Sequence, residues 1–344
     1  MENWNEAIPL SEEDAELLKI RKDLKKRNWK TVLTSLLLAA VILLVSVCGI
    51  VPAAESLYWG PYDSDYSAAQ DTSDLKLVLQ AHSELFQPGY GVGFTAHRTG
   101  FATYELDITR IDIATGEKEY MEGTLKRGKL SLDYCFWNPQ TSMLSQRYFY
   151  RGRYSTPVRP VIASDLERTR ELLAELPSYV SLKAAVSFPE DLTMKQLMRL
   201  NLDYNYSADD GITLHWVGIR NNNDNTDRSI PMCGFSLNFG GNGYGINEVY
   251  PELELESFSP DGTHWEQHFK SLLEFSRDQA QKEKGIRYSM GQEDFYQYVL
   301  DYVEENGVMT YGIMVTGTPE GLLGMLDSGL ASEIVLLDGW IDVG

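Results

Sequence analysis

The chain has 344 residues, of which 43% are hydrophobic and 11% aromatic, so apolar material is ample for one or two folded domains. This composition excludes low-hydrophobicity disorder for most of the length. The formal net charge of −20 disfavours binding to nucleic acid, because an acidic protein repels a polyanion.

The charge is distributed unevenly over the first 54 residues. Residues 1–16 carry six acids and no base, residues 19–30 carry seven bases and one acid, and residues 31–54 carry no charge. Acids and bases are equal in number over residues 1–30, so residues 55–344 carry the whole net charge of −20.

Residues 1–30 are predicted to form a helical tail. Ser11 precedes three acids, which is typical of a helix start, and neither Gly nor Pro follows until Gly49. One helix is therefore predicted from about residue 12 into the apolar segment. The tail contains neither Cys nor His, which excludes a zinc-bound module on this side.

An apolar stripe runs along the predicted tail helix. Leu10, Leu17 and Leu24 recur every seven residues, and Ile20 lies near this stripe. The functional interpretation is a docking face for a partner's groove. The alternative is a juxtamembrane helix that lies on lipid, and three leucines alone favour this alternative.

Residues 31–52 are predicted to form a transmembrane helix. The twenty residues 32–51 are almost wholly apolar, and such a helix spans about 30 Å, the thickness of the bilayer hydrocarbon. Trp29 and Lys30 at one edge and Trp59 beyond the other fit interfacial anchors. Because the basic residues flank the N-terminal side, the tail is predicted to be cytoplasmic and the remainder extracytoplasmic.

Two other interpretations of the apolar segment compete with an uncleaved signal anchor. A cleaved signal peptide needs a shorter apolar core and small residues at the cut, and VPAAES (residues 51–56) matches poorly. A lipid-modified Cys48 is disfavoured because the bulky Val47 stands where a small residue is wanted. The signal anchor is therefore favoured.

Residues 55–160 are predicted to form a β-rich domain. A helix is expected at residues 74–86, after a polar stretch at residues 60–74, and alternating patterns follow at residues 91–113 and 119–134. The turn at residues 114–116 would join these two runs as a hairpin. Pro157 and Pro160 mark the expected end of the domain.

Residues 165–344 are predicted to form an α+β domain in which a strand–helix–strand unit occurs twice. Helices are expected at residues 166–176, 193–200, 265–282, 293–305 and 319–326, and strands at residues 180–188, 212–220, 309–316 and 332–341. Two such units fit a ferredoxin-like sheet backed by helices on one face. The helices at residues 265–282 and 293–305 would then be an insertion.

No catalytic residue, cofactor or metal site is predicted, and the chain is not expected to be an enzyme. His264 and His268 share one helix face, but Trp265 stands where a zinc protease has its Glu, and no third ligand is evident. The glycines of residues 240–245 precede no helix that could receive a phosphate. The oxygen-rich residues 221–227 lack the Gly and distal Glu of a calcium loop, so both segments are interpreted as turns.

The two cysteines beyond the apolar segment, Cys135 and Cys233, show no local signature of a nucleophile. An oxidising compartment would permit a disulfide between them, although nothing in the sequence demands one.

Several segments resemble the membrane-bound sigma factor regulators of Gram-positive bacteria. The juxtamembrane LKKRNWKTVLTSLLLAAVILLV (residues 24–45) resembles their N-terminal region. The segments that resemble their C-terminal domain are YVSLKAAVSFPEDLTMKQLMRL (residues 179–200), HWVGI (residues 215–219) and YGIMVTGTPEGLLGML (residues 311–326).

This resemblance implies an anti-sigma factor that holds an extracytoplasmic-function sigma factor inactive at the inner membrane face. The outer domain would sense envelope state, and Leu10, Leu17, Ile20 and Leu24 would contact the sigma factor. A tail of about 30 residues is short for this task, so a second membrane protein or part of the span is expected to help. The rival interpretation is an anchored extracytoplasmic module that binds a ligand or protein and has an inert tail.

Overall fold

The computed structural model describes residues 12–61, 75–132, 163–206, 211–222, 232–237, 249–253, 255, 259–280 and 292–341. The contacts divide the chain into two compact units, Met1–Tyr58 and Trp59–Gly344. We call them the N-terminal unit and the C-terminal unit.

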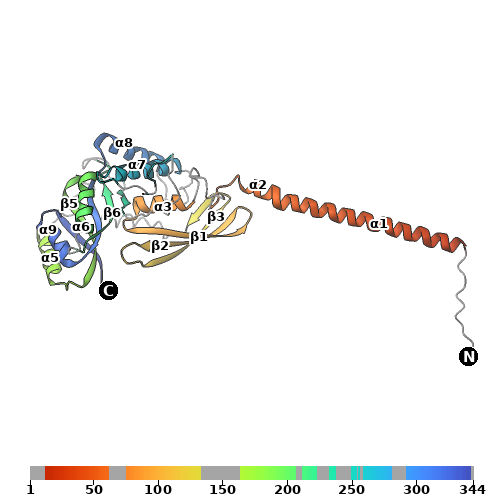
Figure 1. Ribbon diagram of the computed structural model, residues 1–344, viewed down its shortest axis with the longest axis horizontal. Coiled ribbons are helices and arrows are strands. Elements are labelled where there is room, and N and C mark those ends of the chain that lie inside the picture. The colour runs from red at the N-terminus through yellow and green to blue at the C-terminus, as the bar shows by residue number, and fades with distance from the viewer. Residues whose placement is uncertain are drawn as a thin grey trace, which may run out of the picture. The chain divides into compact units, whose positions relative to one another are not determined.

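The N-terminal unit is one long helical run (Figure 1). Helix α1 (Glu12–Val45) leads through a π-helical turn (Ser46–Ile50) into the short α2 (Val51–Glu55). Pro52 lacks a backbone N–H, which accounts for the change of hydrogen-bond pattern just before it. The predicted helix from residue 12 into the apolar segment is confirmed, and Lys19–Glu55 is long and apolar enough to cross a membrane.

The first part of the C-terminal unit is a helix followed by an antiparallel meander. The elements are α3 (Leu75–Phe86), β1 (Tyr90–Gly100), β2 (Thr103–Asp112), β3 (Lys118–Lys126) and β4 (Lys129–Leu132), and the sheet order is β1-β2-β3-β4. The predicted hairpin at residues 114–116 is confirmed. Asp112 caps it, because its Oδ1 accepts the backbone N–H of Ala114 at 2.9 Å.

The two alternating runs that were expected as single strands each contain a further turn. The first run reverses at Ala102 (φ +44°), and the second reverses at Arg127 (φ +50°) and Gly128 (φ +72°). In the second turn both central residues have positive φ, which is the conformation that suits a tight hairpin. Gly100 and Gly128 lie at these turns, and each is a turn signal that the prediction did not use.

The second part of the C-terminal unit is a five-stranded sheet with helices. Its elements are α5 (Ala163–Glu175), β5 (Val180–Thr193), α6 (Met194–Tyr206), β6 (Thr213–Ile219), β7 (Cys233–Ser236), α7 (Thr263–Asp278), α8 (Gln292–Asn306), β8 (Met309–Gly317), α9 (Pro319–Asp327) and β9 (Glu333–Ile341). The strand order is β7-β6-β8-β5-β9, and neighbouring strands are antiparallel. The strands of the two predicted units thus lie in the order second, third, first, fourth, as in a ferredoxin-like sheet.

The α+β fold prediction is confirmed, with two differences in the strands. The four-residue β7 was not predicted, and β5 continues past Pro189, where the expected strand ended. The pairing of β5 with β8 shifts register between Ser187 and Leu192. This irregularity accommodates Pro189, which cannot donate to a regular ladder.

One continuous apolar core joins the two sheets. It includes Leu106 and Ile108 of the meander together with Val186 of β5 and Phe269 of α7, all almost fully buried. Helices α6 and α9 contact the five-stranded sheet, and α7 packs on α8 (Figure 1). The predicted boundary near residue 160 lies outside the described residues.

A smaller apolar cluster covers the other face of the five-stranded sheet. It consists of Ala185, Trp216, Met232, Tyr311 and Met314. The connection between α3 and β1 approaches this face closely, because a Cβ at Gly89 (φ +77°) would lie 2.7 Å from Met314 Sδ. Glycine adopts this φ without strain, and a Cβ here would require the Met314 side chain to shift.

Candidate functional site

The apolar stripe of the tail lies exposed on α1. The exposed fractions are 63% for Leu17, 55% for Ile20 and 52% for Leu24. At about 100° per residue these side chains share one face of the helix. Leu10 lies outside the described residues, so the structure places three of the four predicted partner-binding residues.

The three predicted membrane anchors fall in different units. Trp29 and Lys30 are exposed on α1, and Trp29 is 68% exposed. Trp59 begins the C-terminal unit and packs, partly buried, against its core. A role of Trp59 at the membrane edge stays a prediction.

A buried ion pair joins the meander to the five-stranded sheet. Lys183 Nζ of β5 lies 2.6 Å from Asp112 Oδ2 at the end of β2, and the side chains are 5% and 12% exposed. The same ammonium group lies 4.6 Å from the ring centroid of Tyr90 in β1. These residues, with the nearby His215, form what we call the Lys183 cluster.

A second buried polar group lies where α3 meets α7 and β7. The Glu84 carboxylate accepts the backbone N–H of Ser236 at 2.9 Å, and its Oε1 also lies 2.9 Å from His268 Nε2. The other ring nitrogen of His268 lies 2.6 Å from the carbonyl oxygen of Glu252. The Trp216 indole N–H donates to the Glu84 carbonyl at 2.7 Å. We call this the Glu84 cluster.

His215 is the neutral member of the Lys183 cluster. Burial and the Lys183 cation lower the pKa of His215 from its usual 6.5 to about 4, although Asp112 opposes the shift. The Nε2 atom lies 2.8 Å from the Thr316 hydroxyl. Burial therefore favours the neutral imidazole at neutral pH.

This pKa shift predicts a loss of stability in mild acid. The unfolded chain takes up a proton at His215 near pH 6.5, whereas the folded chain does so only near pH 4, so stabilisation is complete above pH 6.5 and falls as the pH drops toward 4. We expect the His215 contribution to lower the free energy of unfolding by about 2 kcal/mol between pH 6.5 and 5. Urea unfolding of the full chain at pH 7 and pH 5, compared with His215→Asn, isolates the contribution, and an equal pH dependence in both proteins would contradict it.

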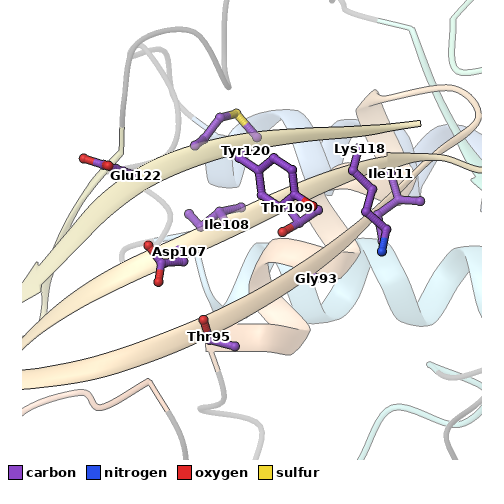
Figure 2. Close-up of a pocket in the computed structure, with 10 residues that line it drawn as sticks. Gly93, Thr95, Asp107, Ile108, Thr109, Ile111, Lys118, Tyr120 and Glu122 are labelled. Carbon is purple, nitrogen blue, oxygen red and sulfur yellow. The ribbon is translucent and has the colours of Figure 1, made fainter. Parts of the chain in front are cut away.

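The meander carries an open hollow of about 740 Å³ on one face (Figure 2). Its polar lining comes from three adjacent strands and includes Thr95, Asp107, Thr109, Lys118, Tyr120 and Glu122. Thr95, Asp107 and Glu122 are register partners in one row across the sheet, and Gly93, Thr109 and Tyr120 form the next row. The hollow therefore combines an aromatic ring with two carboxylates from adjacent strands.

The residues considered as metal ligands have other roles in the structure. His268 is fully buried in the Glu84 cluster, and His264 Nδ1 accepts the backbone N–H of Ser259 at 3.1 Å. No group of three metal-ligating side chains occurs within the described ranges. The glycines of residues 240–245 and most of residues 221–227 lie outside them.

The disulfide hypothesis is untested, because Cys135 is outside the described residues. Cys233 is fully buried in β7, and Asn221 Nδ2 donates to its Sγ at 3.4 Å.

The sequence interpretation missed both buried polar clusters. Lys183 interrupts the apolar strand SLKAAV (residues 181–186), and a lone Lys in such a strand is a signal that it has a buried partner. No comparable signal points to Asp112, which lies 71 positions away. Glu84 resembled an ordinary polar residue at the end of a helix.

Residues 173–330 match the family model described as sigma factor regulator C-terminal. The match covers β5 to α9, which is most of the five-stranded sheet and its helices. No curated protein and no solved structure matches the chain.

Proposed function

Because residues 173–330 belong to the sigma factor regulator C-terminal family, we propose that this chain is a membrane-bound anti-sigma factor. Its tail sequesters an extracytoplasmic-function sigma factor at the inner membrane face. Its C-terminal unit lies outside and senses the state of the envelope. The family supports a regulatory role rather than an enzymatic one.

The observation that supports sequestration is the exposed stripe on α1. Leu17, Ile20 and Leu24 project from the part of the helix that precedes the apolar span, and more than half of each side chain is exposed. Isolated exposed apolar residues are common, but a row on one helix face is the pattern by which helices dock into grooves. A sigma factor that offers such a groove would bury the row.

The stripe can supply much of the required binding free energy. Four Leu and Ile side chains, buried at about 1.5–3 kcal/mol each, contribute about 6–12 kcal/mol before association costs. A micromolar complex needs about 8 kcal/mol net. We therefore propose that a second membrane protein or the first turns of the span extends the contact, and that tethering raises the local concentration.

The orientation follows from the charge beside the span. Seven basic residues lie between positions 19 and 30, whereas residues 31–54 carry no charge and the first charge beyond them is Glu55. Positive residues stay on the cytoplasmic side. The stripe would then face the compartment that contains sigma factors.

The test is capture of sigma factors by the full chain in nanodiscs. Wild-type protein is expected to capture one of the host's sigma factors, and Leu17→Asp and Leu24→Asp are each expected to weaken capture about tenfold or more, because each removes about 1.5–3 kcal/mol of apolar burial. Binding is measured by titration against each purified sigma factor.

Lys22→Ala is the matched control. It changes the net charge by one unit, as Leu→Asp does, but it lies on the opposite side of the helix at about 100° per residue. If Lys22→Ala weakened sigma factor binding as much as Leu17→Asp does, the result would contradict an interface formed by the apolar stripe. Failure of the wild-type chain to capture any sigma factor would favour an extracytoplasmic binding module with an inert tail.

A further inference from the structure

We propose that the hollow on the meander binds an organic cation, an alkylammonium group held between the Asp107 and Glu122 carboxylates and against the Tyr120 ring. This site is separate from the tail and does not depend on the identity of the tail's partner.

The first support is the pairing of two acids on one face of the sheet. Asp107 of β2 and Glu122 of β3 are direct register partners, and both are exposed. Like charges directly opposite one another destabilise a sheet. A cation between the two carboxylates would turn this repulsion into two charge-assisted hydrogen bonds.

The side of Asp107 away from Glu122 has a contact of its own. His97 Nε2 of β1 lies 3.2 Å from Asp107 Oδ2. Because β2 lies between β1 and β3, His97 approaches from the opposite side to Glu122. The His97 contact therefore lies on the β1 side of Asp107, whereas the proposed cation site lies on its β3 side.

The second support is the exposed ring of Tyr120. This side chain is 74% exposed, although it stands in a regular strand two positions before Glu122. Its register partner is Thr109, whose own partner on β1 is Gly93, so its neighbours in the row are small (Figure 2). An exposed aromatic face attracts a cation within about 6 Å of its centroid.

The third support is the open floor at Gly93. A Cβ placed at this residue would meet nothing within 4 Å, and its φ lies outside the left-handed range. Neither packing nor backbone conformation therefore demands glycine here. The missing side chain keeps the hollow open in front of Tyr120.

The charge of the domain fits the same ligand. Residues 55–344 carry the net charge of −20, which attracts cations over a distance. Lys118, the cation in the lining, is four residues from Glu122 and thus about 13 Å away along the strand. Lys118 is therefore too far from Asp107 and Glu122 to occupy the space that a bound cation would take.

The experiment is isothermal titration calorimetry of the full chain in nanodiscs with spermidine and with trilysine. We expect saturable binding of at least one probe. Asp107→Asn, Glu122→Gln and Tyr120→Ala should each weaken it about three- to tenfold. Gly93→Val should weaken it at least as much without any change of charge, because its side chain fills the hollow. Tighter binding of trilysine would indicate a peptide ligand, and tighter binding of spermidine a polyamine.

Glu105→Gln is the matched control, since Glu105 is an exposed acid on β2 two residues from Asp107 and outside the lining. It should leave the affinity within about twofold of wild type, as expected for an exposed charge that does not contact the ligand. Equal weakening by Glu105→Gln and Asp107→Asn, or no effect of Gly93→Val, would show attraction by net charge alone and overturn the proposal. Absence of binding, or binding of calcium ions in place of both probes, would also overturn it.

Discussion

Asp112→Ala is expected to destabilise the C-terminal unit by about 3–5 kcal/mol, because it leaves a buried ammonium group without its counter-ion. Lys183 is 4% exposed, and its Nζ lies 2.6 Å from Asp112 Oδ2. The substitution also removes the acceptor for the Ala114 backbone N–H in the hairpin turn. The measurement is urea unfolding of the full chain in nanodiscs, followed by tryptophan fluorescence.

The double variant Asp112→Ala with Lys183→Met separates the two causes. Removing the cation as well should restore most of the lost stability, since a well-packed apolar replacement of a buried pair is often neutral. What remains should be about 1 kcal/mol for the lost turn hydrogen bond. A double variant as unstable as Asp112→Ala alone would show that the pair is not the source of the effect.

Glu84→Ala is expected to cost a similar 3–5 kcal/mol, because β7 and α7 lose a buried oxygen partner that they share. The Glu84 carboxylate is 3% exposed and receives the Ser236 backbone N–H. His268, which is fully buried, then loses its partner at Nε2. The other ring nitrogen of His268 keeps its contact with the Glu252 carbonyl oxygen, so the loss falls on Nε2.

Glu84→Gln is the conservative comparison for this site. Its amide oxygen can still accept from Ser236, so we expect a loss of about 1–2 kcal/mol. Equal unfolding free energies for Glu84→Ala and the wild type would contradict a structural role for the cluster. Far-UV circular dichroism at low denaturant checks that each variant retains its fold.

The Lys183 cluster connects the strands around the hollow to the five-stranded sheet. Asp112 and Tyr90 belong to the same strands that line the hollow, whereas Lys183 lies in the five-stranded sheet, within the residues that match the sigma factor regulator C-terminal model. The ion pair between Lys183 and Asp112 is therefore a direct contact between the strands around the hollow and the five-stranded sheet. The proposed sensing role would use this contact to connect ligand binding at the hollow with the five-stranded sheet.

Local patterns determined much of this molecule without tertiary information. The unbroken run of helix-compatible residues after Ser11 predicted one helix from Glu12 into the apolar segment, and a span needs only length and apolarity to be recognised. The strand–helix–strand periodicity at residues 180–220 and 309–341 likewise predicted a sheet whose order the structure confirms. These features depend on neighbours within about ten residues of one another, where sequence periodicity is strong.

Only the tertiary structure revealed the features that join distant segments. Lys183 meets Asp112 across 71 positions and Glu84 meets His268 across 184, and no local pattern encodes such partners. The hollow likewise arises because Gly93, Asp107 and Tyr120 fall in adjacent rows of one sheet face. Strand register decides which side chains share a face, and register is set by the pairing of the strands and the geometry of the turns at Ala102 and Gly116, which the sequence alone specified only in part.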